Sequence, residues 1–420
     1  MGIINVAELK PDMMLAEDLK DPKGRFLLAK GAKLTPKILR TIKMWGVIEA
    51  SIEGVSQKDV EADILAQLDP KIIERAKKLI NERFGHTDLE HTPTSKLFHI
   101  SSLRKAKEIS EGIDEEGWEP DDTSETEIDS GEIAQDSVTK IDPNQLIRNE
   151  INLPSLPTIF GQINETIRKP TSSANDIAKV ISKDTALAAR LLKLVNSTFY
   201  GFPSKIDTLS RSVTIIGTKQ ISTLALGMNI INVFKDIPSH LIDMKSFWEH
   251  SIVCGISARI IASYKNIQNT ERLFVAGLLH DIGRLILYSS VPIESKHTLL
   301  RAKYTDNLLY KEETETLGFD HAKIGGLLLK KWKLPISLEN IVQYHHAPQE
   351  SKDPLEPAIV HIADILTNAI GMGSSGERFV PPLDPDAWEC VGLSPNILSL
   401  TIKQLDREIE ETTRFLFSDG

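Results

Sequence analysis

The sequence has few cysteines and no long uninterrupted apolar segment. Its two cysteines, Cys254 and Cys390, fit a reducing compartment and not a disulfide-rich secreted domain. No apolar run approaches the roughly 20 residues that span a bilayer, and the N-terminus lacks the charged and apolar regions of a signal peptide. We therefore expect a cytoplasmic protein that does not associate with a membrane.

The acidic excess of the chain comes from one segment. The sequence has 59 acidic and 49 basic residues, a net charge of −10. Thirteen of the acidic residues lie between Glu108 and Asp136, where Lys and Arg are absent, and 59 − 13 leaves 46 acidic against 49 basic residues elsewhere. Because this segment also has few apolar residues, it cannot bury enough surface to offset the entropy of an ordered chain. No basic stripe with interleaved aromatic residues appears, so we expect no nucleic-acid binding.

Length and this segment divide the chain into four parts. A chain of 420 residues supports two or three domains, and a helical unit of over 200 residues can bury a large core. We assign residues 1–57 to a small N-terminal α/β module, mostly a β-hairpin, and residues 58–107 to a helical connector. Residues 108–141 form a disordered acidic linker, and residues 142–420 form an all-α domain that includes the C-terminal helices.

The N-terminal module is predicted from short apolar strands around a Pro/Gly turn. The segments on either side of residues 21–24 should pair as a hairpin. Thr35 caps a helix whose first residue is Pro36, and a strand from Ile48 to Ile52 follows it. A docking or dimerising role is favoured over ligand binding, so a homodimer is left open.

Seven side chains of the kinds that bind metals recur in the second half of the chain. Most of them lie in apolar segments with helical periodicity, where a buried charge such as that of Asp281 or Asp364 needs a partner or a metal. Imidazole and carboxylate ligands together suit Fe, Mn or Zn. We therefore predict a mono- or binuclear metal centre. Its predicted ligands are His250, His280, Asp281, His321, His345, His346 and Asp364.

Neighbouring histidines limit the geometry of this centre. His345 and His346 occupy adjacent helix positions, which point about 100° apart, so both rings reach the centre only if it straddles the edge of the helix. His361, one turn before Asp364, is either a satisfied core histidine or a residue that supports a ligand.

The order of these ligands resembles the HD superfamily of metal-dependent phosphohydrolases. The stretch from Leu153 to Gly371 is similar to the HDOD family of bacterial signalling domains, above all in the block from Ile181 to Ser197. Apolar residues recur there at helical spacing after Asp184, which predicts an amphipathic helix capped by that residue. The resemblance implies an HD-like helical fold and a regulatory role through protein partners.

The seven ligand positions also resemble those of the HD-GYP family, which hydrolyses cyclic di-GMP, and residues 1–55 resemble the small module in front of many HD-GYP domains. Three positions depart from that family. Residues 347–354 replace its Gly-Tyr-Pro loop, Ser246 stands where several members have a third-metal glutamate, and Arg284 replaces the usual Lys. Metal binding is therefore expected, and cyclic di-GMP hydrolysis is not.

Three functions fit these observations. The resemblance favours a signalling output or scaffold protein that is not an enzyme and whose metal site is structural or vestigial. In the second, a phosphohydrolase acts on a nucleotide or phosphoester: Asp281 bridges two metals, metal-bound water attacks phosphorus, and Arg284 steadies the phosphate. The third is a sensor whose pocket holds a nucleotide ligand or redox-active iron.

Overall fold

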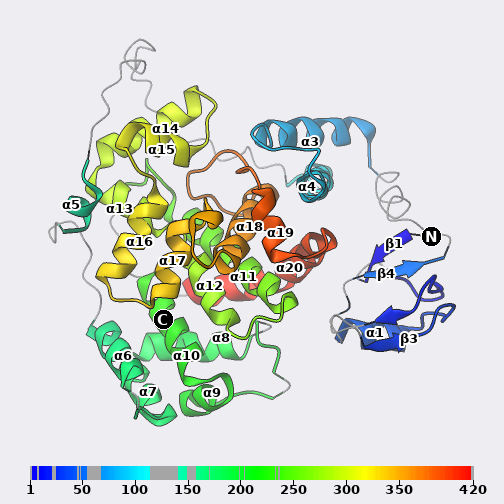
Figure 1. Ribbon diagram of the computed structural model, residues 1–420, viewed down its shortest axis with the longest axis horizontal. Helices are drawn as coiled ribbons and strands as arrows, with labels where there is room; N and C mark the ends of the chain where they lie inside the picture. The colour runs from blue at the N-terminus through cyan, green and yellow to red at the C-terminus, as the bar shows by residue number, and fades with distance from the viewer. Residues whose placement is uncertain are drawn as a thin grey trace.

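In the computed structural model the chain forms a small N-terminal module, a pair of helices and a large helical domain (Figure 1). The structure describes residues 2–6, 9–20, 25–44, 47, 49–53, 68–113, 141–148, 158–169, 171–197, 199–202, 204–231, 233–234 and 237–417. Most of the predicted acidic linker lies outside these residues, as do residues 153–157, which open the HDOD-like stretch. The predicted combination of a small β-containing module and an all-α domain is confirmed.

The described residues of the N-terminal module form two antiparallel strand pairs and one helix. Strand β1 (Gly2–Asn5) pairs with β4 (Glu49–Ile52), and β2 (Leu19–Lys20) pairs with β3 (Phe26–Leu28). Helix α1 (Pro36–Met44) begins after Thr35, whose hydroxyl accepts the N–H of Ile38 at 3.3 Å. The hairpin, the helix and β4 follow the sequence prediction. Strand β1 was not predicted, because its partner lies more than 40 residues later in the chain.

Among the described residues, two helices follow the N-terminal module. Helix α3 (Pro70–Arg83) is capped by Asp69, and α4 (Thr92–Ser110) packs against it. The rings of Phe84 and Phe98 meet edge to face at 5.5 Å. Helix α4 runs three residues into the segment assigned to the linker, and an Arg104–Glu108 pair one turn apart, with Nε and Oε1 3.6 Å from each other, supports this last turn.

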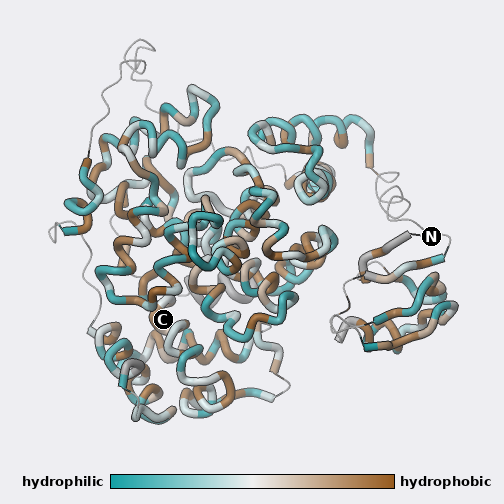
Figure 2. The backbone as a smooth tube through the Cα atoms, viewed as in Figure 1, coloured by the Kyte–Doolittle hydropathy of each residue, from teal (hydrophilic) through white to brown (hydrophobic). Residues whose placement is uncertain are grey.

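The helical domain surrounds three apolar helices with amphipathic ones. In Figure 2, hydrophobic and hydrophilic stretches alternate along its helices, as expected where each helix buries one face. The prediction for the HDOD-like block is confirmed: Asp184 accepts the N–H of Leu187 at 2.9 Å, and Leu187 and Leu191 are fully buried. The domain's elements are α5 (Pro143–Arg148), α6 (Thr158–Arg168), α7 (Ala174–Ile181), α8 (Thr185–Val195), α9 (Leu209–Ile216), α10 (Thr218–Ile230), α11 (Met244–Tyr264), α12 (Thr270–Leu279), α13 (Ile282–Ser290), α14 (Pro292–Tyr304), α15 (Leu309–Leu317), α16 (His321–Lys331), α17 (Ile336–Tyr344), the 3-10 turn η1 (Pro348–Glu350), α18 (Leu355–Ile370), α19 (Pro385–Val391) and α20 (Asn396–Phe417).

Helices α11, α12 and α18 form the centre of the domain. A Cβ atom on Gly277 of α12 would lie 2.7 Å from the Cα of Gly255 of α11, so the two backbones are in direct contact. Among the described residues, Thr270–Ser290 is the one helical stretch long and apolar enough to cross a membrane, and 89% of its most apolar window is buried. This stretch contains Asp281 and Arg284, so it is not an uninterrupted apolar run, and its burial identifies it as core.

Candidate metal centre

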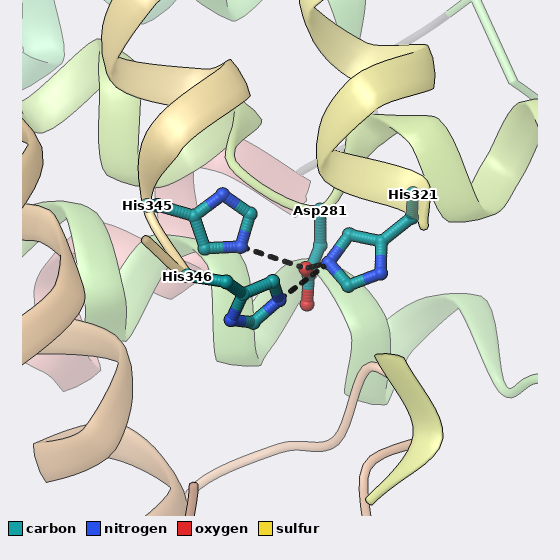
Figure 3. A group of neighbouring side chains, drawn as sticks. All are labelled: Asp281, His321, His345 and His346. Atoms are coloured by element: carbon teal, nitrogen blue, oxygen red, sulfur yellow. Dashed lines mark hydrogen bonds and ion pairs between the residues drawn. The ribbon is translucent and has the colours of Figure 1, made fainter. Parts of the chain in front are cut away.

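The structure brings all seven predicted ligand residues together in two adjacent groups. The ligand atoms of each group lie within 4.8 Å of one another. In Figure 3 the side chains of the first group point toward a common centre from the ends of α16 and α17 and from the break between α12 and α13. The first group is Asp281, His321, His345 and His346, and the second is His250, His280 and Asp364.

Asp281 lies between the two groups and contacts both. Its Oδ1 is 2.7 Å from Nε2 of His321, in the first group, and its Oδ2 is 3.3 Å from Nε2 of His280, in the second. Helix α12 ends at Leu279 and α13 begins at Ile282, so His280 and Asp281 occupy a break in the helix. This short segment therefore supplies His280 to the second group and places Asp281 where a carboxylate could bridge two metal ions.

The second group has the dimensions of a metal coordination shell. The Nε2 atom of His250 is 3.1 Å from Oδ1 of Asp364 and 3.4 Å from Nε2 of His280, and the third side of this triangle is also 3.4 Å. With metal–ligand bonds of about 2.1 Å, neighbouring donors are about 3.0 Å apart in an octahedron and about 3.4 Å apart in a tetrahedron. A metal ion therefore fits these three donors with little rearrangement.

Hydrogen bonds on the far side of three rings turn Nε2 toward the centre. The Nδ1 atoms of His280 and His345 donate to the carbonyls of Gly277 and Val342, each at 2.7 Å. The Nδ1 atom of His321 donates to Glu313 Oε2 at 2.6 Å. Each bond leaves an Nε2 lone pair free to bind a metal. The buried Nε2 of His345 has no hydrogen-bond partner among the described residues, and a metal would satisfy it.

The local charges favour the protonation states that bind metal at some ligands and oppose them at others. Burial lowers the pKa of His345 to about 3, and neighbouring histidines add to the effect. Burial raises the pKa of Asp281, but Arg284 and the histidines around it outweigh burial and hold that pKa well below its usual range. For His321, burial and Arg284 lower the pKa, and the carboxylates of Glu313 and Asp281 together raise it to about 9. A metal would therefore displace a proton from His321.

Arg284 is an internal partner of the carboxylates. Its side chain is 2% exposed, and its Nη1 donates to Oγ of Ser375 at 2.5 Å and lies 3.4 Å from Oδ2 of Asp281. Its Nε lies 3.4 Å from Oε1 of Glu313. The predicted phosphate-holding role needs this guanidinium to reach a substrate, and here its Nη1 and Nε already contact protein oxygens.

Three supporting contacts were not predicted. Asn368 donates to Oδ1 of Asp364 at 2.8 Å, Glu313 orients His321, and the ring of Tyr310 stacks on that of His346 at 4.3 Å. Asn368 lies one helical turn after Asp364, a spacing from which this contact could have been predicted. Glu313 stands among other acidic residues of α15, and nothing in the local sequence distinguishes it.

His361 supports a ligand, the second of the two roles considered for it. Its Nδ1 donates to the carbonyl of His345 at 2.8 Å, and its Nε2 accepts the N–H of Asp384 at 3.1 Å. These two bonds define the neutral tautomer of the ring. They also tie the paired histidines to the segment that precedes α19.

Residues 371–384, here called the covering segment, lie over the carboxylates. Ser375, Glu377 and Pro381 line a gap beside Asp281 and Asp364 that does not admit a water-sized sphere. Gly373 has φ of +66°, and a Cβ there would lie 2.3 Å from the backbone N of His250. Only glycine allows the segment to approach α11 this closely.

Comparisons with known proteins agree with this fold. Residues 153–348 match the HDOD domain family. A crystal structure of an HDOD domain protein from Geobacter sulfurreducens superposes with a TM-score of 0.54 at 21% identity, covering 66% of this chain and 98% of that one. One of a protein named as a phosphohydrolase from Shewanella amazonensis gives 0.53 at 20% identity, covering 66% and 99%.

Two curated relatives match about half of the chain. An uncharacterized protein of Treponema pallidum is 27% identical over 216 residues, which are 50% of this chain and 41% of the relative. Ribonuclease Y of Mycoplasmoides gallisepticum is 28% identical over 233 residues, 53% of this chain and 35% of the relative. The chain thus spans less than half the length of these relatives. The family match identifies residues 153–348 as an HDOD domain, and the superpositions show that its fold is shared with these two solved structures.

Proposed function

We propose that this chain is a signalling protein whose HDOD domain holds an enclosed two-metal centre, and that it acts through contacts with other proteins and not through turnover. The supporting observation is a complete set of metal donors at a site with no room for a substrate. Six of the seven donor residues are at most 4% exposed, and the covering segment closes the gap beside the carboxylates.

The buried charges at the centre favour a divalent cation. Asp281, Asp364 and Glu313 are each at most 4% exposed and bring three negative charges, and Arg284 brings one positive charge. With the histidines neutral, as metal binding requires, the sum is −2, so these charges alone account for one divalent ion. Because unbalanced buried charge is costly, binding of the first ion should be strongly favourable. The mixture of imidazole and carboxylate donors suits Fe, Mn or Zn.

Turnover needs features that are not present in this conformation. A hydrolytic metal site keeps one coordination position open to water or substrate. Here the covering segment lines the gap beside Asp281 and Asp364, and Nη1 and Nε of Arg284 contact Ser375, Asp281 and Glu313. Residues 347–354, after the paired histidines, also lack the Gly-Tyr-Pro sequence of cyclic di-GMP hydrolases.

A metal-dependent phosphohydrolase is the second candidate. It is favoured by the position of Asp281 between the two groups, since a carboxylate that bridges two metals is common where paired ions activate water. The Shewanella protein named as a phosphohydrolase and ribonuclease Y fit this alternative by name. In that case the covering segment would have to move before a phosphoester could reach the centre.

Metal analysis combined with a turnover assay separates the two candidates. The full chain would be reconstituted with Mn²⁺, Fe²⁺ or Zn²⁺, and its metal content measured beside hydrolysis of bis(p-nitrophenyl) phosphate and cyclic di-GMP. We expect about two ions per chain and no turnover. Metal-dependent hydrolysis that Asp281→Asn abolishes would establish the phosphohydrolase instead. A chain that binds no metal would reject both candidates.

A further inference from the structure

Arg83, the last residue of α3, contacts the end of the helix that carries Asp364. Its Nη2 donates to the carbonyl of Asn368 at 2.6 Å, across 285 positions of sequence. Its Nη1 lies against Gly371, where a Cβ atom would be 2.6 Å away. Gly371 has φ of +70°, and its left-handed conformation both ends α18 and makes room for the guanidinium.

This contact stabilises the C-terminal end of α18. The last carbonyls of a helix lack intrahelical partners and carry partial negative charge, so a cation at this end is favourable. Gly371 N–H bonds the carbonyls of Thr367 and Asn368 at 3.1 and 3.3 Å, and Arg83 supplies a charged donor to the second. Arg83, a residue outside the helical domain, therefore caps the C-terminal end of α18, one of the three helices at the centre of that domain.

Asn368 links the cap to the metal donors. Its side-chain Nδ2 donates to Oδ1 of Asp364 at 2.8 Å and to the carbonyl of Asp364 at 3.1 Å. The same Oδ1 is the atom that lies 3.1 Å from His250 and 3.4 Å from His280. Two hydrogen bonds, with Asn368 between them, thus connect Arg83 to a donor of the second group.

The end of α3 also holds the covering segment. The carbonyl of Arg83 accepts the N–H of Val380 at 2.8 Å. Three residues later, the ring of His86 meets that of Phe379 edge to face at 4.7 Å, and its Nε2 donates to the carbonyl of Asp306 at 2.7 Å. Figure 1 shows α3 and α4 beside the part of the domain that contains α18 and α19, and α4 contacts α18 directly.

We infer that Arg83 is a positioning residue of the metal centre, and that the α3–α4 pair regulates how tightly the second group binds metal. The inference rests on the proposed metal centre. When α3 is docked, Arg83 holds Asn368 and Asp364 in the binding arrangement and keeps the covering segment in place. When α3 moves away, the last turn of α18 loses its charged partner and metal affinity falls. The α3–α4 pair, which follows the N-terminal module, therefore influences the geometry of the metal site.

Titration of the metal-free full chain with Mn²⁺, followed by electron paramagnetic resonance, tests this inference. Losing a residue that orients a metal ligand typically lowers affinity 10- to 100-fold. Arg83 reaches the ligand Asp364 only through Asn368. We therefore expect Arg83→Gln to lower the Mn²⁺ affinity of the second group about tenfold and to leave that of the first group unchanged. Arg83→Lys keeps a cation at the helix end and should restore most of the affinity.

Asp406→Asn is the matched control. Asp406 of α20 accepts bonds from Arg104 of α4 at 2.9 and 3.0 Å, and its side chain is exposed. This change therefore removes a weak surface ion pair of α4 and leaves α3 docked, with Arg83 against α18. We expect it to bind Mn²⁺ as the wild type does. The Co²⁺-loaded proteins should show an altered visible absorption spectrum for Arg83→Gln alone.

Three results would overturn the inference. If Arg83→Gln titrates like the wild type, Arg83 has no positioning role, although the metal centre stands. If Arg83→Gln and Asp406→Asn weaken binding equally, the effect is general stability and not the cap. If the wild type binds no Mn²⁺, the proposed function fails and this inference fails with it.

Discussion

Replacing the carboxylate shared by the two groups should remove nearly all stabilisation by metal. In Asp281→Asn, Oδ1 is lost from beside His321 or Oδ2 from beside His280, and the remaining amide is a much weaker ligand. Asp364→Asn removes a donor from the second group only. The two substitutions are alike in chemistry and in burial, so a difference between them reports the bridging position.

The expected size follows from linkage. At a metal concentration a hundredfold above Kd, each site stabilises the fold by about 2.7 kcal/mol. One kcal/mol corresponds to roughly 2–4 °C in Tm for a domain of this size. The wild type should therefore gain about 10–20 °C when Mn²⁺ fills both groups. Asp364→Asn should keep about half of this shift, and Asp281→Asn should keep almost none.

The metal-free proteins give a second measure. Asp281→Asn leaves Arg284 with one buried carboxylate partner, Glu313, in place of two. Removing one partner of a buried ion pair costs about 3–5 kcal/mol, and the retained Glu313 puts the expected loss near 3 kcal/mol. Differential scanning fluorimetry and urea unfolding, each with and without Mn²⁺, measure both effects. Equal Mn²⁺ shifts in the two variants, or an undiminished shift in Asp281→Asn, would refute the bridging role.

Three further predictions concern glycine packing, the pH dependence of stability and the site of proteolysis. Gly283→Ala should destabilise the domain by about 3 kcal/mol, since its Cβ would lie 2.0 Å from the carbonyl of His321, whereas Gly161→Ala, with nothing within 4 Å, should be neutral or stabilising in urea unfolding. Burial raises the pKa of Glu377 from 4.5 to about 7, so the folded state holds this proton more tightly; its contribution to the free energy of unfolding is complete below about pH 4.5 and should fall by up to about 3 kcal/mol as pH rises to about 7, a slope that Glu377→Gln should flatten. From the composition of residues 114–136 we predict that limited proteolysis cuts there first; protection of that segment in mass-spectrometric mapping would contradict the prediction.

His280, Asp281 and Asp364 were candidates from the sequence because these side chains stand out from their local pattern. All three interrupt apolar helical segments, and an isolated polar side chain on a buried helix is a strong signal. The helix from Thr185 to Val195 was predicted for a related reason, because its apolar spacing and its cap at Asp184 agree. Local periodicity is enough for such features.

Other parts of the site depend on contacts between distant segments. Glu313 is buried because α15 places it against Arg284 and His321, and its sequence neighbours Glu312 and Glu315 offer no contrast. Arg83 is the last residue of α3, whose other charged residues form an exposed face. Nothing in the local sequence therefore predicts its hydrogen bond to Asn368. The covering segment has no regular secondary structure, and no hydrophobic period predicts where it lies. Such placements come from tertiary packing.

The covering segment has a consequence for the speed of metal exchange. An ion held beneath residues 371–384 would leave on this side when that segment or the end of α18 opens, and local openings of this kind have their own free energies below that of global unfolding. A chelator would then strip the protein at a rate that rises with chelator concentration and levels off at the opening rate. Metal occupancy would thus lag behind changes in the free metal concentration, and it would stay at its earlier value for as long as the segment stays closed.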